Sequence, residues 1–156
     1  MSGDEQTFGE VSAEARAEGD VAERARRIAG IIRLERGYRW VGIYEVTETE
    51  IGAIGWTGTE APAHIRFPIT KGLSATAVKT RAVVNVTDVT KESHYLVAFG
   101  NTRSEIIVPV ISRGGDVVGT IDAESDRVNA FGEEDKQFLQ KCAERILPLY
   151  AKAGQP

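Results

Sequence analysis

A change of hydrophobic period along the chain constrains the fold more than any other feature. Near the start, four apolar residues recur at steps of four, three and four positions, namely Val21, Ala25, Ile28 and Ile32. This spacing predicts one apolar stripe along a helix. Asp20 suits an N-cap and Gly37 suits the residue just past a helix end, so we expect this helix to run from Asp20 to about Arg36.

The middle of the chain has the patterning of strands. Aromatic and β-branched runs alternate with polar segments, which is typical of antiparallel strands joined by short loops. The expected strands are 39–46, 51–56, 63–67 and 82–86, with a short helix at 72–80. Residues 87–101 have mixed periodicity and are expected to form an irregular or partly helical connection, and a loop this long is often functional.

The last part of the chain predicts a hairpin and a helix. Strands at 105–111 and 116–122 flank the glycine pair Gly114 and Gly115, which suits the positive φ angles of a tight turn. Pro109 indicates a sheet edge or a position whose N–H is not needed. From Glu133 the apolar residues fall on one helical face: Phe138, Leu139, Cys142, Ile146 and Leu149. Hairpin strands between terminal helices indicate an α+β domain, an antiparallel sheet covered by those helices.

Composition excludes several classes of protein. The chain has 156 residues, 42% of them hydrophobic and 27% charged, which suits one globular domain. Its only cysteine, Cys142, excludes an intrachain disulfide and a four-cysteine zinc site, and favours a cytoplasmic protein. No apolar run approaches the ~18 residues of a membrane span, and the polar start does not look like a signal peptide. We therefore expect no membrane partner.

The net charge of -4 is unevenly placed. Residues 1–20 hold six acids and one base, a sum of -5, so the remaining residues sum to +1. We divide the chain into an acidic leader at 1–19, either frayed or a short helix, a single domain at 20–152, and a tail at 153–156. The nearly neutral domain does not predict a nucleic-acid partner. Arginines crowd residues 24–39, and a solvated helix face or a contact with the leader explains them better than a nucleic-acid surface.

Several segments together resemble the GAF domain family. They are Trp40-Val-Gly-Ile-Tyr44, Ile69-Thr-Lys-Gly-Leu-Ser-Ala-Thr-Ala77, Arg103-Ser-Glu-Ile-Ile-Val-Pro-Val110, Val118-Gly-Thr-Ile-Asp-Ala-Glu-Ser125 and Phe131-Gly-Glu-Glu-Asp135. The resemblance implies a central antiparallel sheet with N- and C-terminal helices packed on one face and a ligand pocket on the other. Within this family the chain looks most like the free methionine-(R)-sulfoxide reductases, whose members are stand-alone domains of this size.

The resemblance also exposes a difference, because the three cysteines of those reductases are missing. Their places fall at His64, Ser74 and approximately Ala98. Reduction of a sulfoxide by this route needs one thiolate to attack sulfur and a second thiol to resolve the oxidised cysteine. Cys142 lies on the apolar stripe of the last predicted helix, where a buried structural thiol is expected. Redox catalysis is therefore not supported.

At the pocket positions of the family that are not cysteines, this sequence has matching residues. The resemblance implies that Tyr44, Trp56, Glu105, Asp122 and Glu124 cage a ligand and hold its ammonium group, with Ser74 and His64 on the pocket floor. Asp122 and Glu124 are two apart on a strand, so both point to one face, and two carboxylates sharing a site favour a bound cation. An aromatic wall adds cation–π attraction.

Each of these residues also has a plainer interpretation. The two acids could form a solvated strand end paired with Arg103 or Arg127, and surface pairs of this kind are weak. Both aromatic residues could simply pack in the core, and His64 could be structural. We expect neither a metal nor a cofactor.

Three functions stay open at this point. The first is a non-catalytic, stand-alone GAF domain that serves as a sensor or regulatory module and binds a small, amino-bearing ligand. The second is an enzyme of the free methionine-(R)-sulfoxide reductase type. The third is an interaction module without a ligand, in which the terminal helices form a homodimer, and a light-scattering mass equal to the 17.0 kDa monomer would remove it.

Overall fold

The structure, a computed structural model, describes residues 3–93 and 100–151. Ala98 and the predicted tail at 153–156 lie outside the described residues. The elements in chain order are α1 (Gly3–Arg16), α2 (Val21–Arg36), β1 (Trp40–Val46), β2 (Glu50–Thr57), β3 (Arg66–Pro68), α3 (Gly72–Thr80), β4 (Val84–Val86), the 3-10 turn η1 (Val89–Lys91), β5 (Ser104–Ile111), β6 (Val117–Ser125), α4 (Glu133–Arg145) and the 3-10 turn η2 (Leu147–Tyr150).

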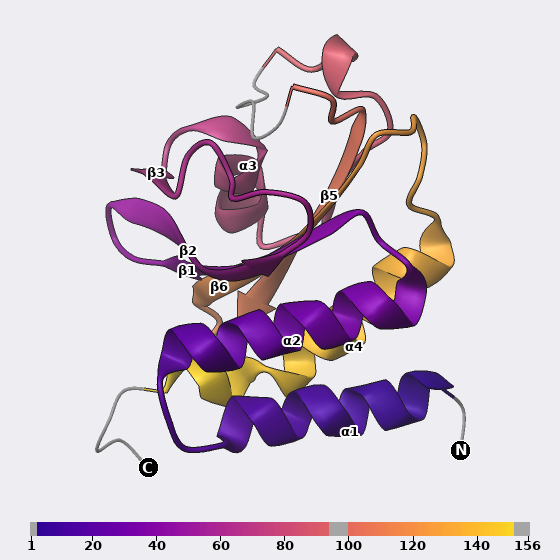
Figure 1. The fold of residues 1–156 in the computed structure, drawn as a ribbon. Coiled ribbons are helices and arrows are strands. Elements are labelled where there is room, and N and C mark those ends of the chain that lie inside the picture. Colours follow the sequence, from indigo (N-terminus) through magenta and orange to yellow (C-terminus); the bar gives the residue numbers. More distant parts are fainter. Residues whose placement is uncertain (1–2, 94–99, 152–156) are drawn as a thin grey trace.

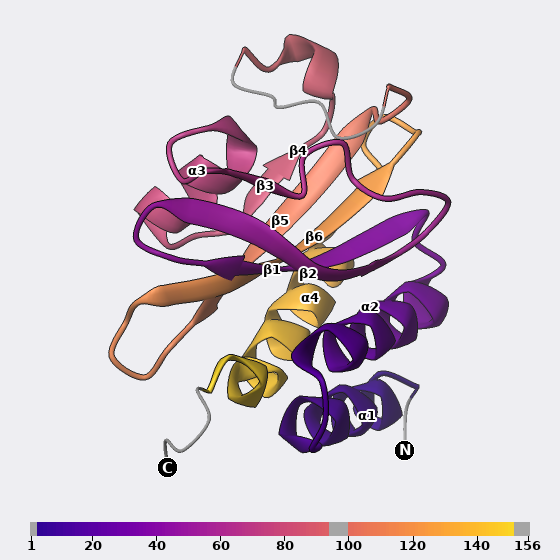
Figure 2. The same ribbon diagram turned by 60° about the vertical axis from the view of Figure 1, so that its left-hand side comes forward.

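The strands form one antiparallel sheet in the order β3-β2-β1-β6-β5-β4. Helices α1, α2 and α4 lie on one side of this sheet, and α3 lies on the other side (Figure 1). The turned view keeps the same division, with the sheet between the two groups of helices (Figure 2). The α+β fold class, with terminal helices packed on one face, is confirmed.

Helix α2 begins and ends where its capping residues predict. The Asp20 carboxylate accepts a hydrogen bond from the Glu23 N–H at 3.2 Å, which satisfies an N–H of the first turn. Gly37 adopts the left-handed conformation at φ 68° and donates its N–H to the Arg33 carbonyl at 2.8 Å. Local signals alone therefore fix both ends.

Of the two alternatives for the N-terminal segment, the structure has the helix. Phe8 and Val11 of α1 are buried in the same core as α2 and α4. Arg24 of α2 donates to the carbonyl of Ala15 at 2.6 Å, and Arg27 pairs with the Glu14 carboxylate at 2.9 Å. The contact between the acidic segment and the arginines of α2 thus accounts for two of those arginines.

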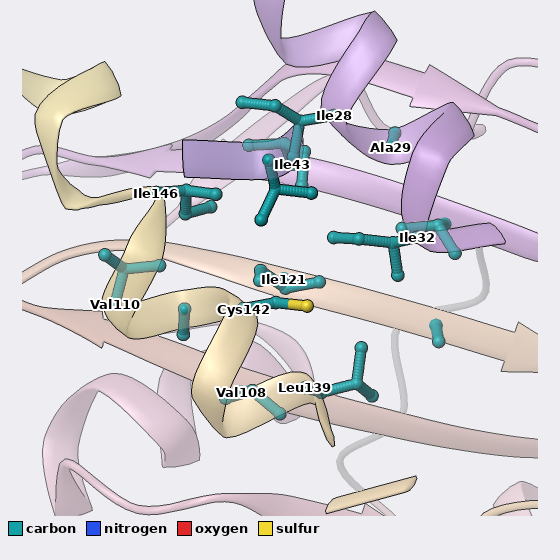
Figure 3. Close-up of a cluster of buried hydrophobic side chains, with 14 of the residues drawn as sticks. Ile28, Ala29, Ile32, Ile43, Val108, Val110, Ile121, Leu139, Cys142 and Ile146 are labelled. Atoms are coloured by element: carbon teal, nitrogen blue, oxygen red, sulfur yellow. The ribbon is translucent and has the colours of Figure 1, made fainter. Parts of the chain in front are cut away.

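The main core lies between the sheet and helices α1, α2 and α4. Its buried members include Ile28, Ile32, Ile43, Ile121, Leu139 and Ile146. Figure 3 shows the Cys142 sulfur pointing into this cluster, and the side chain is fully buried. The apolar stripe predicted for the last helix is confirmed. The α-helix itself stops at Arg145 and continues as η2, because Pro148 disfavours the helical conformation in the residue before it.

Strand ends differ from the prediction in two informative places. The hairpin strand expected to stop at residue 122 continues to Ser125 in β6, since β1 pairs with it as far as Glu124 and β5 as far as Ser125. The third strand is shorter than expected, at Arg66–Pro68. Pro109 pairs with Thr120 on one side and lies beyond Ile107, the last β5 residue that pairs with β4. It therefore sits where β5 has no neighbour on its other side, as predicted. No helix in the described part of the chain is long and apolar enough to cross a membrane.

Candidate ligand-binding site

Three carboxylates share the face of the sheet that is turned away from α2 and α4. Glu105 of β5 stands directly opposite Glu124 of β6, and Asp122 lies two residues before Glu124 on the same strand. Because side chains alternate along a strand, all three point to one face. On the other side of β6, Gly42 stands opposite Asp122 and Trp40 stands opposite Glu124. The acids therefore lie in adjoining rows of one surface, beside the aromatic residues of β1.

These acids are buried. Glu105 is 7% exposed, Asp122 4% and Glu124 2%. Such burial argues against the alternative of a solvated strand end. The Thr120 hydroxyl donates a hydrogen bond to Asp122 Oδ1 at 2.8 Å, which holds this carboxyl in place on the strand. Buried ionisable groups are rare unless they are paired or serve a function, so the cluster is a candidate site.

Burial changes the acidity of the cluster. Loss of solvation, followed by the charge of Glu124, raises the pKa of Asp122 to about 8, although the hydrogen bond from Thr120 opposes this rise. Burial and the charges of Glu124 and Asp122 also raise the pKa of Glu105 well above its usual value. The Tyr44 pKa is raised by burial first and then by the same three acids, so this phenol lies close to them. A bound cation would relieve the repulsion.

An aromatic cluster adjoins the acids. The ring centroids of Trp40 and Tyr44 are 6.5 Å apart, and Phe67 of β3 meets Tyr44 edge-on at 6.2 Å. Trp56, which is half-buried, stands opposite Gly42 and packs against the same cluster. A Cβ on Gly42 would collide with the rings of both Trp40 and Tyr44, so glycine is what lets these rings close over the strand. The site therefore combines carboxyl groups with π faces, which suits an organic cation.

The other two predicted floor residues lie in different surroundings. Ser74 is buried on α3, one helical turn before Val78, which packs against the aromatic cluster. Residues four apart share a helix face, so Ser74 lies on the face of α3 turned toward that cluster. His64 is exposed in the segment between β2 and β3, and it is not among the buried residues around the acids. The structure thus brings five of the seven predicted residues, Tyr44, Trp56, Glu105, Asp122 and Glu124, to one face.

Three residues of the site were not predicted. Trp40 and Thr120 could have been found from the strand period, because Trp40 is four residues before Tyr44 and Thr120 is two before Asp122. Phe67 gave no such signal. It reaches Tyr44 only because β3 pairs with β2, and the sequence does not reveal that pairing.

The described residues do not contain a group of three or more histidine, cysteine, aspartate or glutamate side chains placed to hold a metal ion.

Comparison with known proteins identifies the family. The family model for the GAF domain matches residues 20–147. The chain belongs to the GAF domain family. The solved structure of a type II free methionine-R-sulfoxide reductase from Thermoplasma acidophilum is 32% identical to this GAF domain, with a TM-score of 0.75 over 84% of this chain and 95% of that one. The reductase from Neisseria meningitidis, solved with its substrate, is 25% identical, with a TM-score of 0.82 over 94% of this chain and 87% of that one.

Among characterised sequences, the free methionine-R-sulfoxide reductase of Saccharomyces cerevisiae is 34% identical over 110 residues. The match spans 69% of this chain and 60% of the yeast protein's length. The predicted relationship to the reductase-like branch of the GAF domains is confirmed.

Proposed function

We propose that this chain is a non-catalytic GAF domain that binds a small, amino-bearing molecule against the sheet face formed by β1, β5 and β6, and that it serves as a sensor or regulatory module. The observation that carries the proposal is the buried acid cluster of Glu105, Asp122 and Glu124 beside Trp40 and Tyr44. Three acids buried side by side cost folding free energy, and a bound ammonium group offsets that cost through charge-assisted hydrogen bonds.

Free methionine-(R)-sulfoxide reduction is the second candidate, because proteins similar to this chain carry that name. The number and the burial of the cysteines argue against this activity. Its single thiol, Cys142, lies in the core between α4 and the sheet, and burial raises the pKa of that thiol. The thiolate needed to attack sulfur is therefore disfavoured, and no second cysteine exists to resolve an oxidised one. A thioredoxin-coupled assay on free methionine-(R)-sulfoxide should show no turnover, whereas turnover above background would favour the enzyme.

A calorimetric screen of amino acids, amines and nucleotides tests the binding proposal. Each amino-bearing hit is paired with its deaminated analogue, for example methionine with 4-(methylthio)butanoate, so that only the ammonium group differs. We expect the analogue and the double variant Asp122→Asn with Glu124→Gln to bind at least about 100-fold more weakly, which corresponds to about 3 kcal/mol.

The matched control for that variant is Asp116→Asn, which removes one charge from an exposed residue at the turn before β6. It should bind like the unmodified protein. Failure of every amine to bind, or unchanged binding by the double variant, would show that the acid cluster is not a ligand site.

A further inference from the structure

A cavity lies on the opposite side of the sheet from the acid cluster, where three separate parts of the chain meet. It has a volume of about 710 Å³, which is in the range of small-molecule sites. The end of α1, the turn between β5 and β6, and the end of α4 with η2 form its walls. Figure 2 shows the C-terminal end of α4 beside the last turn of α1.

The walls of this cavity are basic. Each of the three parts supplies one arginine: Arg16 from α1, Arg113 from the turn and Arg145 from α4. Glu144 is the one acidic residue in the lining, so the walls carry a formal charge of +2. Among the described residues, none of the three arginines takes part in an ion pair. Within residues 3–93 and 100–151, no carboxylate therefore forms an ion pair with these three arginines.

Helix dipoles explain part of this arrangement but not all of it. Arg16 and Arg145 lie in the last turns of their helices, where a cation is favourable. No helix dipole favours the charge of Arg113, because this residue lies on the turn between two strands. That turn is well ordered, since Ser112 accepts hydrogen bonds from Asp116 N–H through its side chain at 3.2 Å and from Gly115 N–H through its carbonyl at 2.9 Å. The backbone of Arg113 is thus part of an ordered turn at the edge of the cavity.

We propose that this cavity binds the phosphate group of a small phosphorylated metabolite. Arginines from three elements line the cavity, and the guanidinium of Arg145 also lies over the Phe8 ring, 5.9 Å from its centroid. Several guanidinium groups suit the three oxygens of a phosphoryl group, whereas a carboxylate is satisfied by a single guanidinium fork. The hydroxyls of Ser12 and Ser112 line the same cavity and add donors. A phosphate alone would not fill the volume, and apolar side chains of β6 and η2, Val118 and Leu147, offer a surface for the organic remainder.

The test is calorimetric titration of the full chain with inorganic pyrophosphate and with ribose 5-phosphate, at about 50 mM salt so that screening is weak. Ribose and citrate serve as controls for the sugar and for carboxylate charge. We expect saturable binding of one phosphorylated probe per chain, no binding of ribose, and weaker binding of citrate. Raising the salt to about 0.5 M should weaken the phosphate affinity severalfold.

Variants test whether the phosphate binds in this cavity. Arg113→Gln, on the exposed turn, should weaken pyrophosphate binding about tenfold, as loss of one charged hydrogen-bonding partner does. Lys141→Gln removes the same charge from an exposed residue of α4 outside this cavity and should change the affinity less than twofold. The double variant Asp122→Asn with Glu124→Gln should leave phosphate binding intact, which keeps this test separate from that of the amine site. Absence of saturable pyrophosphate binding, tighter binding of citrate, or equal affinity in Arg113→Gln would overturn the proposal.

Discussion

The buried acid cluster predicts that the stability of the unliganded protein falls as the pH rises through neutrality. Asp122 has a pKa of about 8 in the folded chain against 3.8 in an exposed reference, so the folded state holds a proton that the unfolded state has lost. Between these two values the unfolding free energy decreases by about 1.4 kcal/mol per pH unit for this one group. From pH 5 to pH 7 the loss is about 3 kcal/mol.

Three further carboxyl groups with shifted pKa values agree with this sign or lie outside this pH window. The raised pKa of Glu105 acts in the same direction, because this residue too holds its proton more strongly when folded. The pKa values of Glu23 and Asp88 are lowered from 4.5 and 3.8, so their contributions are lost only as the pH falls into the acid range below this window. The loss is easy to measure, because the total unfolding free energy of a protein is only ~5–15 kcal/mol.

Urea unfolding at pH 5, 6 and 7, followed by tryptophan fluorescence, checks the prediction. Asp122→Asn, which keeps the shape of the side chain and can still accept the hydrogen bond from Thr120, should reduce the slope by about 1.4 kcal/mol per pH unit and stabilise the protein at pH 7. Asp116→Asn should keep the full slope. A flat or rising stability between pH 5 and pH 7 in the unmodified chain, or an unchanged slope in Asp122→Asn, would refute the reasoning.

Three further predictions concern packing. Gly42→Ala should lower the unfolding free energy by about 1–3 kcal/mol, because the added Cβ collides with the two rings over β1. Gly30→Ala on α2, which has open space around it, should raise the unfolding free energy by up to ~1 kcal/mol. The midpoint of urea unfolding tests both variants. Cys142 should react with a thiol reagent only after unfolding in urea, and rapid labelling of the native chain would contradict its burial. Tyr150→Phe should cost about 1 kcal/mol in the same urea assay, because its hydroxyl donates to the Tyr44 carbonyl at 2.7 Å, and an unchanged midpoint would mean that this bond adds nothing.

Local signals in the sequence were sufficient wherever a structural feature depends on neighbouring residues. Asp20 and Gly37 set the ends of α2, and the apolar stripe of α4 places Cys142 in the core. The alternation of a strand puts Asp122 and Glu124 on one face. The resemblance to GAF domains added Glu105 to the same site, which agrees with its place in the sheet.

Features that depend on strand register could not be predicted in this way. Counting outward from the hairpin turn fails between Val110 and Ile111, because the register shifts there by one residue. A one-residue slip turns every side chain to the other face, so the turn alone does not reveal that Glu105 stands opposite Glu124. The aromatic cluster beside the acids likewise depends on contacts between distant parts of the chain, such as that of Phe67 with Tyr44.

The basic cavity shows the same limit. In the sequence, Arg113 follows Arg16 by about a hundred residues, and Arg145 follows Arg113 by about thirty. Each of them looks like an ordinary surface residue. Only the packing of α1 and α4 beside the β5–β6 turn brings them together. Tyr150 lines this cavity and bonds to the backbone of Tyr44, so the two proposed sites lie on either side of one strand.

The most direct test of the central proposal, that the buried acids hold a cationic group, is to measure protons released on binding. An amino acid that binds is titrated at about pH 7 in two buffers of different ionisation enthalpy, where Asp122 is mostly protonated before binding. If the ammonium group enters the cluster, Asp122 loses its proton and Glu105 can lose its proton too, so at least about half a proton should leave per bound ligand. Binding without proton release, or equal binding of the deaminated analogue, would contradict the proposal.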